Sequence, residues 1–145
     1  MFGSITLNQV VGGINRKAAE AARDAGVKNL VVPHPEWWIV DMGLEDQIRM
    51  VKDYDVVLER CYAQNMGGGI YKSNLPDNVE VIREVGYEHI LVSTDGGQVE
   101  NPYWETALAE YMEYLVDHWI PAEQVDYMTK VQPAKLLGLE ERGGG

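Results

Sequence analysis

The chain has 145 residues, 46% of them hydrophobic, and a formal net charge of −11. This length suits a single domain with a packed core, and the acidic balance disfavours nucleic acid or an anionic membrane as partner, since both would repel it. One cysteine excludes a disulfide framework, and the absence of a spanning-length apolar run or a signal peptide predicts a soluble, cytoplasmic protein.

In chain order, the first predicted element is a strand at Ser4–Leu7. A helix follows, with Asn15 as its cap and Gly26 as its stop. The alanines expected on the buried face of this helix are Ala18, Ala21, Ala22 and Ala25. A second strand is predicted at Leu30–Val32, where the apolar residues are continuous and not alternating, as in strands buried on both faces.

The middle of the chain repeats this alternation of helix and strand. The second helix has an apolar stripe at Leu44, Ile48 and Val51. The third strand is predicted at Val56–Leu58. The third helix begins at Asp77 or Asn78, ends at Gly86, and carries its stripe at Val79, Ile82 and Val85.

The fourth strand, Ile90–Ser93, precedes the strongest helix prediction, in which Asn101 is the cap and Pro102 the first helical residue. The expected core-facing stripe of that helix is Trp104, Leu108, Tyr111, Met112, Leu115, Val116 and Trp119. A final helix from Pro121 carries Val125, Met128 and Val131 and ends before Pro133.

The predicted order, β-α-β-α-β-α-β-α-α, indicates an α/β fold with a parallel sheet and helices packed outside it. We assign residues 1–142 to one domain and residues 143–145 to a flexible glycine tail.

The candidate site residues follow the strands, because chemistry in parallel α/β folds gathers at the carboxyl ends of strands. In chain order they are Asn8, His34, Glu59, Thr94, Asp95 and Gln98. His34 is clamped between Pro33 and Pro35, which limits the backbone on both sides of the imidazole. By position, it is the histidine of the chain that suits a site.

Each of these residues also has a structural interpretation. His34 could be hydrogen-bonded in a strand-to-loop turn, and Asp95 could cap the turn of its "DGG" segment. For Glu59 we favour a solvated strand end paired with Arg60 or a lysine. For Cys61 we favour a small core residue.

Four segments resemble the late strands and closing helix of the amidohydrolase-like metal-dependent hydrolases. They are "LVVPHPEW", "VVLERCYAQ", "ILVSTDGGQVENP" and "VQPAKLLGL". The resemblance implies a (β/α)8 TIM barrel, with His34 and Asp95 as ligands of a divalent metal, expected to be Zn²⁺. The family's first-strand His-x-His motif and its fifth-strand histidine are absent, and the four predicted strands amount to about half of a barrel.

This resemblance implies a hydrolase in which metal-activated water attacks a small amide, ester or lactone-like substrate. Asp95 would be the catalytic proton carrier, and Glu59, Thr94, Gln98 and Asn8 would be accessory or substrate-binding residues. The expected partners are a small-molecule substrate and a second copy or another chain that completes the barrel, without nucleic acid or membrane. The alternative is a non-catalytic remnant, a structural α/β module without a complete metal site.

Overall fold

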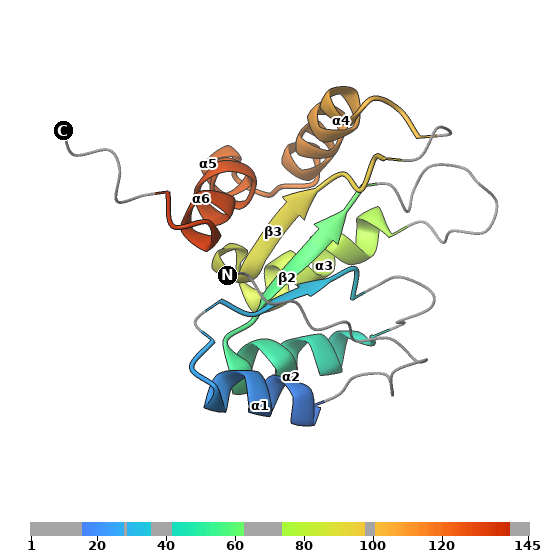
Figure 1. Cartoon of the computed structure of the whole chain (residues 1–145). Helices are drawn as coiled ribbons and strands as arrows, with labels where there is room; N and C mark the ends of the chain where they lie inside the picture. The colour runs from blue at the N-terminus through green and yellow to red at the C-terminus, as the bar shows by residue number, and fades with distance from the viewer. Residues whose placement is uncertain (1–15, 28, 36–41, 63–73, 98–100, 140–145) are drawn as a thin grey trace.

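The computed structural model describes residues 16–27, 29–35, 42–62, 74–97 and 101–139. Within these ranges, three strands form one parallel sheet in the order β1-β2-β3 (Figure 1). They are β1 (Val31–Pro33), β2 (Val57–Cys61) and β3 (Ile90–Ser93). Val32 of β1 pairs with Leu58 of β2, which in turn pairs with Ile90 of β3. The predicted parallel α/β architecture is confirmed, while the expected strand Ser4–Leu7 lies outside the described residues.

Helices separate the strands along the chain and pack around the sheet (Figure 1). The early helices are α1 (Arg16–Asp24), α2 (Leu44–Tyr54) and α3 (Leu75–Val85), followed by the 3-10 turn η3 (Tyr87–His89). The late helices are α4 (Trp104–Asp117), α5 (Ala122–Asp126), the π-helical η4 (Tyr127–Val131) and α6 (Gln132–Leu136). Helix α2 contacts both α1 and α3, whereas α6 and η4 pack against β3. Within the described ranges, no helix combines the length and apolar character needed to cross a bilayer.

The hydrophobic core lies between the sheet and these helices. Leu58 and Ile90 are fully buried on the strands, and Tyr111, Leu115 and Met128 are fully buried on the helices that cover them. Val57 and Leu58 at the start of β2 are both buried, which explains why this part of the strand is apolar without alternation.

Two helices bury only part of the face that the sequence predicted for them. On α1 the buried residues include Ala19 and Ala22, whereas Ala21 and Ala25 are exposed. On α4 the buried residues are Ala107, Tyr111 and Leu115. The aromatic ends of the expected stripe are instead exposed: Trp104 is 64% and Trp119 is 86% accessible, and Val116 is 44% accessible. The stripe prediction was therefore too wide, because Trp104 starts the helix and Trp119 lies beyond its end with a φ of 67°.

Helix boundaries also differ from the prediction at three places. Helix α3 begins at Leu75, with Asn74 as its N-cap, earlier than Asp77 or Asn78. Helix α4 begins at Trp104, after Asn101 and Pro102. The last helical segment continues through Pro133, and the π-helical turn η4 directly precedes it. A wider turn at this point accommodates the proline, which cannot donate a regular helical hydrogen bond.

A buried polar network fixes β2 to its two neighbouring helices. Arg60 is fully buried, donates from Nε to Oδ1 of Asn78 on α3 at 2.7 Å, and donates from Nη1 to Oε1 of Gln47 on α2 at 2.7 Å. Asn78 in turn donates to the hydroxyl of Tyr111 on α4. Gln47 also donates to the carbonyl of Met42 at 2.7 Å. One guanidinium therefore ties three elements together.

Candidate metal centre

The imidazole of His34 stands directly after β1, at the carboxyl edge of the sheet. Its backbone φ is 47°, in the left-handed region, and its side chain is 24% exposed. Residues that precede proline disfavour helical backbone angles, and His34 precedes Pro35. The two prolines and the left-handed turn together limit the backbone freedom of this histidine.

Asp95 follows β3 at the same edge and approaches the same imidazole. Its Oδ2 lies 3.4 Å from Nε2 of His34, and its side chain is 45% exposed. The φ of Asp95 is 46°, so this residue also has a left-handed backbone. Asn101, which was expected to cap a helix, donates from Nδ2 to the Asp95 carbonyl at 3.3 Å instead. The loop after β3 is thereby held against the start of α4.

Strand β2 contributes Glu59 and Cys61, which are two residues apart and so share one face of the strand. Arg60 points to the opposite face, toward Gln47 and Asn78. The proposed pairing of Glu59 with Arg60 at a solvated strand end is therefore wrong. β2 extends to Cys61, beyond the predicted end at Leu58, and this places Glu59 inside the strand.

A ring nitrogen of His34, Sγ of Cys61 and a carboxylate oxygen of Glu59 all lie within 4.8 Å of one another. The distance between Nε2 and Sγ is 3.9 Å. Tetrahedral zinc sites have bond lengths of about 2.0–2.3 Å, which places neighbouring ligand atoms about 3.3–3.8 Å apart. The histidine and cysteine are thus close to ligand spacing, and the Glu59 carboxylate has at most about 1.5 Å to close.

The surroundings of this cluster suit a cation. Two carboxylates and a thiol surround one imidazole, so positive charge at this point would be favourable. Ser93 on β3 places its Oγ 3.0 Å from Sγ of Cys61, where a hydroxyl can donate to a thiolate.

Tyr62, the residue after Cys61, donates a hydrogen bond of 2.6 Å to Glu110 on α4. Burial, reinforced by that carboxylate, raises the pKa of Tyr62 to about 12, so the phenol remains a neutral donor.

The structure thus brings together three of the residues selected from the sequence, namely His34, Glu59 and Asp95. Thr94 precedes Asp95 at the same edge and is half-buried, while Asn8 and Gln98 lie outside the described residues. Cys61 and Ser93 were missed as site residues. The signal for Cys61 was its spacing of two from Glu59, which places both on one face once the strand is known to continue.

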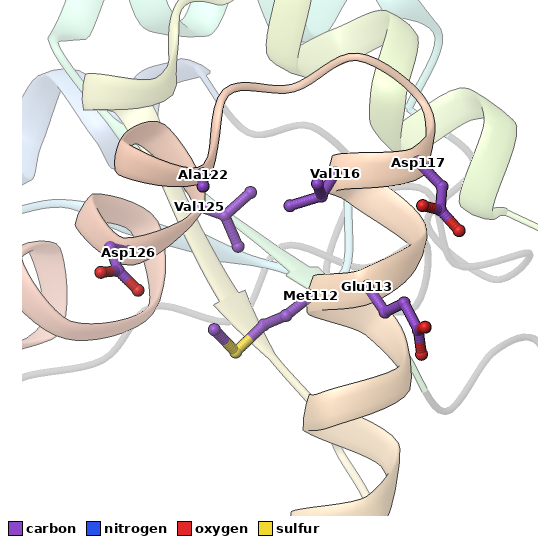
Figure 2. Close-up of a pocket in the computed structure, with 7 residues that line it drawn as sticks. All are labelled: Met112, Glu113, Val116, Asp117, Ala122, Val125 and Asp126. Atoms are coloured by element: carbon purple, nitrogen blue, oxygen red, sulfur yellow. The ribbon is translucent and has the colours of Figure 1, made fainter.

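A separate hollow of about 250 Å³ lies between α4 and α5 (Figure 2). Its walls are formed by Met112, Glu113, Val116, Asp117, Ala122, Val125 and Asp126. Apolar and acidic residues line this space, and neither histidine nor cysteine is among the lining residues. This hollow therefore offers a small apolar cleft, and the His34 cluster remains the candidate for chemistry.

Comparison of the chain with protein-family models, with curated proteins and with solved structures gave no match. The functional argument consequently rests on the geometry of the cluster.

Proposed function

We propose that this protein is a metal-dependent hydrolase that acts on a small amide, ester or lactone-like substrate. The observation that carries the proposal is the group formed by His34, Glu59 and Cys61, whose ligand atoms lie within 4.8 Å of one another at the carboxyl edge of a parallel sheet. Asp95 stands beside this group, 3.4 Å from Nε2 of His34.

The donor set is consistent with a divalent metal of the zinc type. Imidazole, thiolate and carboxylate are the ligands that Zn²⁺ takes, and catalytic zinc sites use three protein ligands with one position left open. The sequence resemblance implied His34 and Asp95 as ligands. His34, Glu59 and Cys61 offer the three protein ligands that such a site uses, and Asp95 lies beside them. A bound metal of this kind would supply Lewis-acid activation of water and polarisation of a substrate carbonyl.

The remaining residues have roles that follow from their positions. The Asp95 carboxylate is half-exposed, so it can orient an incoming water, accept its proton and return that proton to the leaving group. Its oxygen is also near enough to His34 to contact the same ion, the ligand role that the sequence resemblance implies. Thr94 and Gln98, on either side of Asp95 in sequence, are proposed to contact the substrate.

We further propose that the three described strands belong to part of a (β/α)8 arrangement. The support is the parallel order β1-β2-β3, with a helix between successive strands and the polar cluster at their carboxyl edge. In barrels of this kind the active site is built at that edge from the ends of several strands.

Metal content separates this proposal from a structural role. Wild-type protein dialysed against Zn²⁺ should retain about one ion per chain, and His34→Ala and Cys61→Ser should lose it, because each removes one of three ligands. His89→Ala is the matched control, since His89 precedes β3 at the opposite, amino edge of the sheet and pairs with Asp55 at 3.6 Å. That variant should retain the metal.

Zinc-loaded wild type should then hydrolyse at least one class in a panel of small esters, lactones and amides. Equal metal content in wild type, His34→Ala and Cys61→Ser would contradict the proposal. The chain would then be the alternative, a structural α/β module in which His34 and Asp95 make an ordinary side-chain contact.

A further inference from the structure

Asn74 joins the start of α3 to the end of β2 that carries the cluster. This residue is fully buried, and its Nδ2 donates to the carbonyl oxygen of Cys61 at 3.0 Å. Asn74 occupies the N-cap position of α3 but makes no side-chain capping hydrogen bond there. Its amide is thus directed toward Cys61 and not toward the first turn of its own helix.

The first turn of α3, which follows Asn74, is held by hydrogen bonds. The carbonyl of Asn74 accepts from the backbone N–H of Asn78 at 2.8 Å. Asn78 itself accepts from the buried Arg60 and donates to Tyr111. The start of α3 is therefore a fixed point from which one amide reaches the site.

Cys61 is the last residue of β2, and its ladder partner on β3 is Ser93. The N–H of the following peptide unit, that of Tyr62, donates to the Ser93 carbonyl at 3.1 Å. The carbonyl of Cys61 is the other polar group of that peptide unit, so a second contact there fixes the backbone that carries the thiol from both sides. The Asn74 amide holds the Cys61 carbonyl on one side, and Ser93 approaches the Cys61 sulfur at 3.0 Å.

We propose that Asn74 is a positioning residue for the thiolate ligand, acting through the Cys61 carbonyl to hold Sγ near Nε2 of His34. This inference rests on the proposed metal-binding function. Residues that orient metal ligands typically contribute a factor of about 10–100 to metal affinity, because a misplaced ligand must be reordered when the ion binds.

Two measurements on Asn74→Ala test the inference. In the metal-free protein, Cys61 should react several-fold faster with a thiol reagent, because its backbone is no longer held. In the presence of Co²⁺ as a spectroscopic probe, the affinity should fall by about 10–100-fold and the thiolate-to-cobalt charge-transfer band should weaken. If Asn74→Ala does not fold, Asn74→Ser carries the same measurements, since serine is a preferred N-cap with a shorter side chain.

Thr129→Val is the matched control, because it removes a side-chain hydrogen bond of 2.8 Å to the Val125 carbonyl on elements that carry neither Asn74 nor Cys61. Its thiol reactivity and Co²⁺ affinity should remain near those of wild type. Equal thiol reactivity in Asn74→Ala and Thr129→Val, or Co²⁺ affinity unchanged from wild type in Asn74→Ala, would overturn the role of Asn74 alone. A wild type that binds no Co²⁺ would overturn the metal proposal as well, and thiol labelling would still report whether Asn74 holds Cys61.

Discussion

At the scale of single residues, two side chains of the candidate site sit on an unfavourable backbone. His34 and Asp95 have φ values of 47° and 46°, in the region that glycine adopts most easily. Left-handed angles cost a residue with a Cβ about 1–2 kcal/mol, with aspartate and asparagine at the lower end. His34 follows β1 and Asp95 follows β3, and their side chains are 3.4 Å apart, so this backbone strain lies where the chemistry is proposed.

The role of Asp95 can be separated from its backbone preference by Asp95→Asn. Asparagine adopts the left-handed region as readily as aspartate, so the free energy of unfolding should change by less than about 0.5 kcal/mol. Hydrolysis should be lost, because the amide cannot accept a proton from water. Turnover assays and urea unfolding of the same preparation check this, and full activity in the variant would leave Asp95 with a turn-capping role only.

At the scale of elements, the sheet edge is rigid because β2 is fixed from behind. Arg60 connects β2 to Gln47 on α2 and to Asn78 on α3, opposite the face that carries Glu59 and Cys61. A buried guanidinium is stable only where its donors find acceptors, so helices α2 and α3 must keep their places relative to β2. The same contacts that satisfy a buried charge also fix the ligand-bearing strand.

Gln47→Met tests this connection. The change removes the oxygen that accepts a 2.7 Å hydrogen bond from the buried guanidinium of Arg60. The free energy of unfolding, measured by urea denaturation, should therefore fall by about 2–3 kcal/mol. Gln124→Met is the control, since Gln124 on α5 is only partly buried. Its effect should stay within about 0.5 kcal/mol. A Gln47→Met variant as stable as the control would mean that the network carries little of the stability.

At the scale of the whole molecule, the described sheet has two edge strands, β1 and β3. Among the described residues β1 and β3 each pair with β2 alone, and strand edges of this kind favour pairing with another chain. Exposed aromatic residues add apolar surface, since Tyr103 is 81% and Trp119 is 86% accessible. A twofold pair could bring two copies of the cluster and further strands together.

We expect light scattering at micromolar concentration to give a mass of about twice the 16.3 kDa of one chain. Dilution should shift the mass toward the monomer if the association is reversible. A single species near 16.3 kDa across the concentration range would contradict the dimer. The described sheet would then have to be stable without a partner strand.

The sequence by itself determined the features that depend on local pattern. Continuous apolar runs located β1, β2 and β3 to within a few residues. Their alternation with helices predicted that the strands run parallel to one another. Parallel strands end at one edge, so residues that follow the runs must lie near one another there. For this reason His34, Glu59 and Asp95 could be grouped before the structure was known.

Only the tertiary structure decided which way the remaining side chains face. Trp104 and Trp119 were expected in the core and are exposed, while Arg60 was expected at a solvated strand end and is fully buried. Cys61 is fully buried, as predicted for a small core residue, and it is also a member of the cluster, because β2 runs three residues beyond its apolar pattern. The physical reason is that a side chain's direction at the end of an element depends on where hydrogen bonding stops and what packs against it, and both are set by residues distant in the sequence.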